Sequence, residues 1–212
     1  MEFVKVSRVN KSIEIHSSYE VYIDHVESSL SMIAKGRNGR ALLDEIEKYG
    51  VNGKHIKIFI NHHDDNSTIP ILTSAQAAKY SLPDDISCDE NQMKAMTLAQ
   101  KGWFGFSGQG SSAKIRHHPE QTINVDKAGI PKRGYNRYLA FISLSHELAH
   151  ALHMMNGTLL TSDKFDFSDP SNPNTQEEDR AIGIGKFKDE KLSENGIRED
   201  HGIPLRSQYY LR

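Results

Sequence analysis

The segment 138–157 constrains this chain most, because it is apolar, of helical length and free of proline. Such a run predicts a helix, and its high apolar content predicts that the helix is buried. The Asn-Gly pair that closes it is a typical C-terminal signal. The polar side chains inside the run include His146, Glu147 and His150. Burying them is costly unless a metal ion or hydrogen bonds compensate, so they are the first candidates for a functional site.

The spacing of these three residues predicts a metal site. Residues four apart lie on one face of a helix, so His146 and His150 can direct ring nitrogens at one ion. Glu147 is rotated by ~100° from His146 and lies at the edge of that face, where it can reach a metal-bound water. This His-Glu-x-x-His spacing is typical of zinc metallopeptidases, in which zinc acidifies the water and the glutamate accepts its proton.

A catalytic zinc usually takes three protein ligands, so a third must lie elsewhere. A metzincin would have glycine at position 153 and histidine at position 156. This chain has His153 and Asn156, which excludes that class. His153 shares the helical face of the other two histidines but lies one turn further on. We therefore expect it to be a buried histidine outside the ligand set.

A carboxylate is the better candidate for the third ligand. After the polar stretch 161–175, which we expect to be a surface loop, the chain continues as Gln-Glu-Glu-Asp-Arg at 176–180. Thr175 or Asn174 can cap a helix there, and acidic residues suit its first turn. Adjacent residues of a helix diverge by ~100°, so only one of Glu177 and Glu178 can complete the site. The pattern alone leaves both open.

Several segments together resemble a known family. They are His-Glu-Leu-Ala-His-Ala-Leu-His-Met-Met-Asn-Gly at 146–157, Glu-Glu-Asp-Arg-Ala-Ile-Gly-Ile-Gly at 177–185, the run 192–209, and 39–47 further upstream. They resemble the NleD-type zinc metallopeptidases, effectors that bacteria inject into host cells by type III secretion. The helix motif followed by Glu-Glu-x-Arg is more distantly similar to clostridial neurotoxin light chains, which are also zinc proteases. That resemblance implies Glu178 as the third zinc ligand, with Glu177 outside the ligand set.

The same resemblance implies a role for the C-terminal Arg206 and Tyr209. In the neurotoxin-like enzymes an Arg-x-x-Tyr pair faces the zinc and stabilises the oxyanion. The chemistry is suitable, because a guanidinium and a phenol held in position stabilise the charge that develops on the peptide oxygen. Tyr210 is adjacent and remains the alternative phenol.

Composition limits the other possibilities. The net charge of -2 argues against a nucleic-acid partner, and no apolar run is long enough to span a membrane. The single Cys88 excludes an internal disulfide and lies among acidic residues, which disfavours a reactive thiolate. The N-terminus lacks the apolar core of a cleaved signal peptide. We expect one domain over 1–212 and a monomer.

The hydrophobic pattern predicts an α+β fold, a compact zincin-like domain with a small sheet, the motif helix and a helical C-terminal part. We expect a hairpin or extended start over 4–15, helices over 19–33 and 40–48, and strands at 56–60, 113–118 and 122–126. A strand edge beside the zinc, formed by one of the last two, would receive a peptide substrate by β-addition. The glycine-rich stretch 105–112 reads as a loop. We expect the histidine-containing segments 62–65 and 117–118 to be a solvated turn and a strand surface, respectively.

The sequence thus predicts a zinc endopeptidase with His146, His150 and Glu178 as ligands and Glu147 as general base. The resemblance implies host stress-activated MAP kinases, cut in the activation loop, as candidate substrates. It also implies delivery into the host cytoplasm. Two alternatives remain: a zinc protease with unrelated substrates, and a non-catalytic zinc-dependent binding protein.

Overall fold

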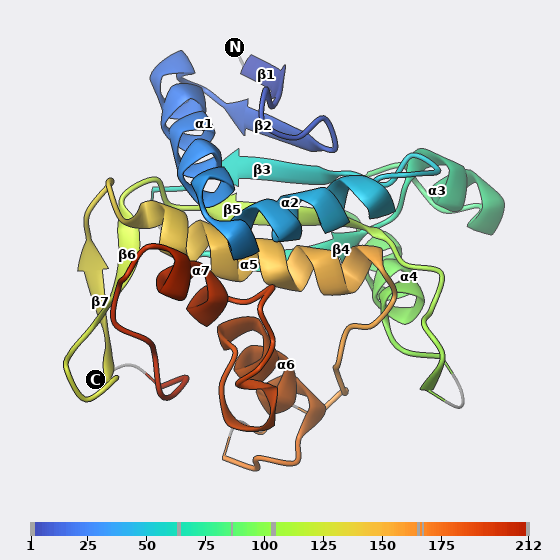
Figure 1. The fold of residues 1–212 in the computed structure, drawn as a ribbon. Helices are drawn as coiled ribbons and strands as arrows, with labels where there is room; N and C mark the ends of the chain where they lie inside the picture. Colours follow the sequence, from blue (N-terminus) through green and yellow to red (C-terminus); the bar gives the residue numbers. More distant parts are fainter. Residues whose placement is uncertain are drawn as a thin grey trace.

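The computed structural model describes residues 3–62, 65–85, 87–102, 105–164, 166 and 168–210. Strands and helices both occur along the chain, and the fold is of the α+β class (Figure 1). The strands are β1 (Phe3–Val6), β2 (Ile13–Ser17), β3 (Ile56–Ile60), β4 (Ser67–Ile71), β5 (Ser112–His117), β6 (Gln121–Val125) and β7 (Pro131–Tyr135). The helices are α1 (Glu20–Lys35), α2 (Arg37–Tyr49), α3 (Ser74–Tyr80), α4 (Asp89–Ala99), α5 (Ala140–Met155), α6 (Pro173–Ile182), the short η2 (Gly185–Phe187) and α7 (Glu194–Asp200).

Five strands form one mixed sheet in the order β1-β2-β3-β5-β4. The hairpin β1-β2 is antiparallel, β2, β3 and β5 run parallel, and β4 returns antiparallel to β5. Strands β6 and β7 pair with each other in a separate two-stranded sheet. Consequently β4 is an edge strand of the main sheet, whereas β5 lies inside it.

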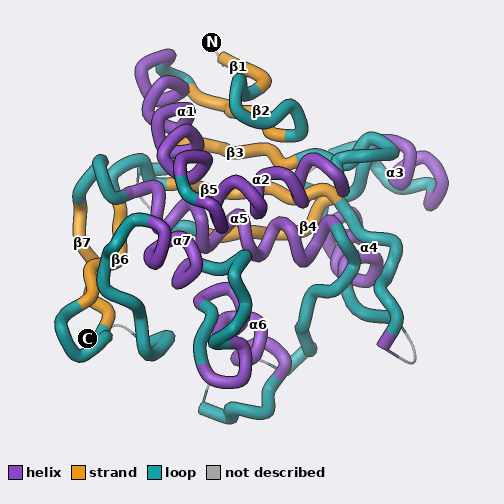
Figure 2. Tube along the Cα trace, in the orientation of Figure 1, coloured by secondary structure: helices purple, strands orange, loops and turns teal. Residues whose placement is uncertain are grey.

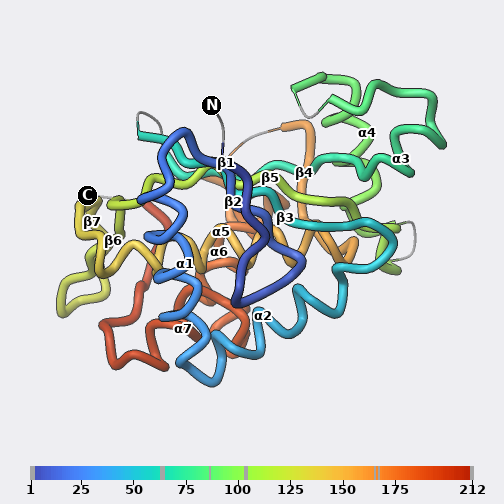
Figure 3. Tube along the Cα trace, turned by 90° about the horizontal axis from the view of Figure 1, so that it is seen from above, coloured from blue at the N-terminus to red at the C-terminus, as the bar shows by residue number. Residues whose placement is uncertain are grey.

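One face of the sheet is covered by helices. Seen from above, α1 and α2 lie along this face, and α3 and α4 lie beyond the β4 end (Figure 3). The alternating isoleucines of the strands point toward the helices, as Ile15, Ile58 and Ile115 illustrate, each fully buried. They pack with Leu30 of α1 and Leu148 of α5 in one hydrophobic core. Burying this apolar surface is the main favourable contribution to folding.

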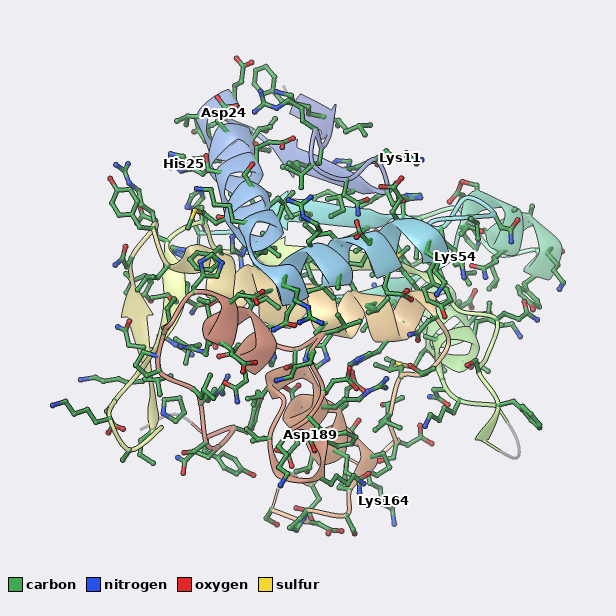
Figure 4. All side chains as sticks on the ribbon, viewed as in Figure 1. Lys11, Asp24, His25, Lys54, Lys164 and Asp189 are labelled. Atoms are coloured by element: carbon green, nitrogen blue, oxygen red, sulfur yellow. The ribbon has the colours of Figure 1, made fainter. Side chains whose placement is uncertain are left out.

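Helix α5 runs through the middle of the molecule, between the sheet and the C-terminal part (Figure 1). Every residue of α5 except His146 is buried, which confirms the prediction from its apolar sequence. The helix ends at Met155 with Asn156 as its C-cap, and Gly157 follows with a left-handed φ of 71°. Lys54 donates to the carbonyl of Met155 at 2.7 Å, so a cation stabilises the C-terminal end of the helix dipole (Figure 4).

The C-terminal part is helical, as predicted, with α6 and α7 joined by η2 and loops beside α5 (Figure 2). The expected cap of α6 was wrong, because Asn172 accepts from the backbone of Asn174 and the helix begins at Pro173. Proline favours this first position because its missing N–H is not needed there. No helix among the described residues combines the length and apolar character that crossing a membrane requires.

Most of the predicted elements are present, including the N-terminal hairpin, the first helix and the strands β3, β5 and β6. Helix α2 begins at Arg37, three residues earlier than predicted. The reason is tertiary: the carboxylate of Asp200 in α7 accepts from the backbone of Asn38 and Gly39 at 2.7 and 3.0 Å. A distant residue thus satisfies the first N–H groups of this helix.

One expectation about an individual position was wrong. His117 is not a strand-surface residue; it is fully buried on the helix-covered face of β5. Of the two strands expected to offer a free edge beside α5, β5 is excluded because it lies inside the main sheet, whereas β6 is an edge strand that contacts α5, as is the unpredicted β4. Of the predicted turn at 62–65, residues 63 and 64 lie outside the described residues.

Candidate metal centre and active-site cavity

A cavity of about 530 Å³ lies along one face of α5. Its walls come from segments that are far apart in the sequence: β4, β6, the segment after α5, α6, and the C-terminal tail. From α5 it receives side chains at the spacing of one helical face, namely Ser143, His146, Glu147, His150 and Met154. The predicted motif is therefore part of a cavity wall.

Three side-chain atoms converge in this cavity. The Nε2 atoms of His146 and His150 lie 3.1 Å apart. Oε2 of Glu178, which comes from α6, lies 3.3 Å from the first and 3.5 Å from the second. The structure thus brings together the three residues that the sequence analysis proposed as ligands, from two separate helices.

The convergence fits a tetrahedral metal ion. A zinc ion with ligands at about 2.0–2.1 Å requires ligand atoms roughly 3.3 Å apart, close to the three observed separations. Two imidazole nitrogens that face each other need a proton or a cation between them, since their lone pairs otherwise repel. Two histidine nitrogens and a carboxylate oxygen are also a donor set that zinc favours.

Each histidine has a second carboxylate behind it. Nδ1 of His150 donates to Oε1 of Glu177 at 3.0 Å, and Nδ1 of His146 lies 3.2 Å from Oε2 of Glu194. A proton held on Nδ1 leaves the Nε2 lone pair directed at the point of convergence. Carboxylates in this position orient ligand histidines and make them more basic.

The two neighbouring glutamates of α6 therefore differ in position. Glu178 reaches the point of convergence, whereas Glu177 lies behind His150 and also accepts from Nδ1 of His153 at 2.6 Å and from the backbone of Leu160 at 3.1 Å. His153 is buried and held by Glu177, and its Nδ1 contacts none of the three converging atoms. The place of His153 outside the ligand set stays a prediction, because His150, His153 and Glu177 form a second group of side chains whose ligand atoms lie close together.

The site favours positive charge at its centre. Burial alone lowers the pKa of a histidine, but the carboxylates of Glu178 and Glu194 outweigh it and raise the pKa of His146 to about 8. The pKa of His150 is raised well above its usual value in the same way. Burial raises the pKa of a carboxyl, yet the neighbouring histidines lower that of Glu177 to about 2 and that of Glu178 further. Ionised carboxylates around two basic histidines suit a bound cation.

Glu147 is buried beside this centre and has one specific partner. The hydroxyl of Thr68 in β4 donates to Oε2 of Glu147 at 2.6 Å. Burial raises the pKa of Glu147, and the hydrogen bond from Thr68 acts in the opposite direction. A carboxylate with a raised pKa is closer to the value that a general base needs near neutral pH.

The C-terminal tail folds back over the cavity. Arg206 is buried, donates to Oε2 of Glu194 at 3.0 Å, and also donates to the backbone carbonyls of Gln208 and Tyr209. Tyr209 and Tyr210 both line the cavity. Burial, with a smaller effect of the Glu178 charge, raises the pKa of Tyr209 to about 12, so its phenol stays protonated at physiological pH. The guanidinium of Arg206 is therefore engaged with Glu194 and the tail backbone.

Sequence reasoning missed three residues of this site: Thr68, Glu194 and Arg198. Glu194 is completely buried and joins His146 to Arg206, while Arg198 donates to its other oxygen at 2.8 Å. Glu194 lies in the first turn of α7, where an acidic residue is unremarkable. Thr68 carries no sequence signal, because its role depends on where an edge strand passes α5.

A family model matches most of the chain. A profile of the M91 peptidases, described as effector proteins, matches residues 9–209, and the chain belongs to this family. The NleD-type resemblance noted in the sequence is thereby confirmed. No curated protein matches the chain significantly in sequence.

Solved structures with partial similarity are light chains of botulinum neurotoxins. That of Clostridium botulinum serotype F is 12% identical with a TM-score of 0.47, and the match covers 90% of this chain and 68% of that one. The type G light chain is 14% identical with a TM-score of 0.46, over 82% and 50%. The serotype HA light chain is 19% identical with a TM-score of 0.44, over 69% and 37%. The chain thus spans between about a third and two thirds of their lengths.

Proposed function

We propose that this protein is a zinc-dependent endopeptidase, delivered into host cells as an effector and acting on a host protein. The observation that carries the proposal is the convergence of His146, His150 and Glu178 at tetrahedral ligand spacing, with the buried carboxylate of Glu147 beside them. Membership of the M91 effector peptidases supports both the activity and the delivery.

In this proposal His146, His150 and Glu178 hold the zinc, and Glu177 and Glu194 orient the two histidines from behind. A bound zinc ion supplies a Lewis acid that brings the pKa of a water to about 7. Glu147 accepts the proton of the attacking water and then transfers it to the leaving amine. Thr68 holds the carboxylate of Glu147 in the orientation for both transfers.

The phenol of Tyr209 donates to the oxygen on which negative charge develops. Its raised pKa supports this role, because the proton to be donated is retained throughout the working pH range. Arg206 contributes positive charge at the same wall and holds the tail that carries Tyr209. Tyr210 is more exposed than Tyr209, which favours Tyr209 as the donor.

Metal analysis and a Glu147→Ala variant test the mechanism. We expect one zinc per chain in both proteins and a loss of about 10²–10⁴-fold in peptide cleavage for the variant. Zinc retained together with lost cleavage would show that Glu147 acts as the base and not as a metal ligand. A Glu147→Ala protein as active as the wild type would refute the proposed mechanism.

Host stress-activated MAP kinases are the candidate substrates, on the basis of family membership alone. Purified protein is to be incubated with host-cell lysate and new N-termini mapped by mass spectrometry, with Glu147→Ala as the matched control. New N-termini within kinase activation loops, absent from the control, are the expected result. If only other proteins are cleaved, the proposed peptidase activity holds and the proposed substrate is wrong.

A further inference from the structure

The C-terminal tail, residues 203–210, has no helix or strand, yet it carries Arg206 and Tyr209 into the wall of the active-site cavity. A second cavity, of about 330 Å³, lies beside the same tail and is lined by Leu205, Arg206 and Ser207. The tail thus borders two cavities, and Leu205 is 50% exposed. A segment with so few packing contacts depends on individual hydrogen bonds for its position.

The side-chain amide of Asn195 in α7 makes a two-point contact with this tail. Its Oδ1 accepts from the backbone N–H of Arg206 at 2.8 Å, and its Nδ2 donates to the backbone carbonyl of the same residue at 2.8 Å. A carboxamide has the donor and acceptor of a peptide group, so the two bonds resemble a bonded residue pair of a β-ladder. Nδ2 also donates to the carbonyl of Gly183, at 3.3 Å, which is the C-cap of α6. The amide therefore joins the tail to the helix that carries Glu178.

The position of Asn195 within α7 is itself fixed. Ser193 caps this helix, because its Oγ accepts from the backbone N–H of Gly196 at 3.2 Å. The next residue, Glu194, binds the guanidinium of Arg206 at 3.0 Å, and Asn195 binds the backbone of Arg206. Two consecutive residues of α7 therefore hold Arg206, one at its side chain and the other at its main chain.

The backbone of Arg206 in turn determines where Tyr209 lies. Between these two residues the chain turns back on the guanidinium, which donates to the carbonyl of Tyr209 and to the carbonyl before it. Ser207 is anchored as well, since its N–H and its Oγ both donate at 2.9 Å to the carbonyl of Gly129, between β6 and β7. This part of the tail is thus one unit, and the phenol of Tyr209 follows the backbone that Asn195 holds.

We propose that Asn195 is a positioning residue of the peptidase. Its amide fixes the backbone of Arg206, so that the phenol of Tyr209 meets the peptide oxygen on which negative charge develops. In this role Asn195 does not contact the substrate, and it acts on the reaction through Tyr209. The inference rests on the proposed function, in which Tyr209 donates to that oxygen. Its importance follows from distance, because displacing a group by about 1 Å in such a site can cost roughly 100-fold in rate.

The two kinetic constants respond differently when the amide of Asn195 is removed. The charge on the peptide oxygen develops only in the transition state, so a displaced phenol lowers kcat and leaves KM nearly unchanged. The zinc content does not change, because the hydrogen bonds that the structure describes for the Asn195 side chain involve none of the proposed ligands. This combination distinguishes a positioning role from a general loss of stability.

A double-mutant cycle on the zinc-loaded full chain tests the dependence on Tyr209, with a synthetic peptide that spans a cleavage site mapped in lysate. Asn195→Ala lowers kcat roughly 10- to 100-fold in the wild-type background, but no more than about twofold in a Tyr209→Phe background. Asn38→Ala is the matched control. The side-chain amide of Asn38 donates to the carbonyl of Gly196 in the same helix, and no bond described for it reaches the tail. The control matches its parent in both backgrounds.

Hydrogen–deuterium exchange, measured by mass spectrometry, reports the position of the tail without any cleavage assay. The amides of the tail exchange faster in Asn195→Ala than in the wild type, whereas those of α5 exchange at the same rate. Asn195→Asp gives a second variant of equal size. It keeps the acceptor for the N–H of Arg206 but places a carboxylate oxygen against two carbonyls, so it shows the same faster exchange and the same loss of kcat.

The outcomes separate this inference from the proposed function. If the zinc-loaded wild type cleaves no protein in the lysate, the proposed function is wrong and this inference is wrong with it. If the wild type cleaves and Asn195→Ala cleaves equally well, only the inference is overturned. It is also overturned if Asn195→Ala loses as much kcat in the Tyr209→Phe background as in the wild type, since Asn195 then does not act through Tyr209.

Discussion

His117 is fully buried and the side chain of His146 is only 13% exposed, yet the surroundings of these two histidines have opposite effects on their charge. Carboxylates lie near both ring nitrogens of His146 and raise its pKa to about 8. Neither ring nitrogen of His117 has a hydrogen-bond partner within the described parts of the chain, and burial lowers its pKa to about 3. Burial alone therefore does not create a cation site. The carboxylates that α6 and α7 place around His146 make the difference.

The largest expected effect comes from removing the carboxylate at the centre. Glu178→Ala deprives the site of one of its three proposed ligands, so we expect zinc to be lost and peptide cleavage to fall to background. Metal analysis after dialysis and a peptide-cleavage assay measure this. If Glu177→Ala loses zinc and Glu178→Ala keeps it, the two glutamates are assigned the wrong way round.

A smaller effect on zinc binding is expected from changing Glu177, the carboxylate that accepts from Nδ1 of His150. Glu177→Gln weakens the hold on His150 and His153 without removing a proposed ligand, and such changes typically cost 10–100-fold in metal affinity. Competition with a zinc chelator measures the affinity. Glu90→Gln, at an exposed position of α4, serves as the control and should match the wild type.

We expect His117, the histidine buried in the core, to affect how the free energy of unfolding depends on pH. His117 binds a proton in the unfolded chain below about pH 6.5 but resists it in the fold down to about pH 3. Stability is therefore fully present above pH 6.5 and is lost as the pH falls, by at most about 1.4 kcal/mol per pH unit. Replacement by leucine removes this contribution.

Urea unfolding of zinc-free wild type and His117→Leu at several values between pH 7 and pH 4.5 measures the difference. The raised pKa of His146 contributes stability at low pH that is lost as the pH rises through about 8, and it affects both proteins equally. Parallel curves for the two proteins would show that His117 is not held neutral by its surroundings.

The smallest effect is expected at Thr68. Its hydroxyl lowers the pKa of Glu147, so Thr68→Val raises that pKa and moves the acid limb of the cleavage profile to higher pH, by up to about one unit. Zinc binding should not change. Thr97→Val at an exposed position of α4 is the control. An unshifted acid limb would mean that Glu147 does not determine it.

A site residue could be predicted from the sequence when its partners lie within a few residues of it along the chain. His146, Glu147 and His150 could be found from sequence because a helical turn alone brings them together. The local sequence pattern did not distinguish Glu177 from Glu178 as the third ligand, and only the family resemblance favoured Glu178. The place of Asn172 as the α6 cap, and the start of α2, depended on contacts that no short window contains.

Much of the fold was also predicted from the sequence. The helices and strands with clear periodicity were found, and the α+β class was correct. Strand β4, which has Pro70 in its sequence and borders the cavity as an edge strand, was missed. The single domain over 1–212 and the monomeric state stay predictions.

By itself the sequence determined a buried helix with two histidines and a glutamate on one side of it, since periodicity and burial follow from residue order. Only the tertiary structure decided which carboxylates surround these histidines. Glu178, Glu177 and Glu194 come from two other helices, and Thr68 comes from an edge strand. The physical reason is that the charge of a buried histidine depends on neighbours within a few ångström, and packing supplies those neighbours from distant parts of the chain.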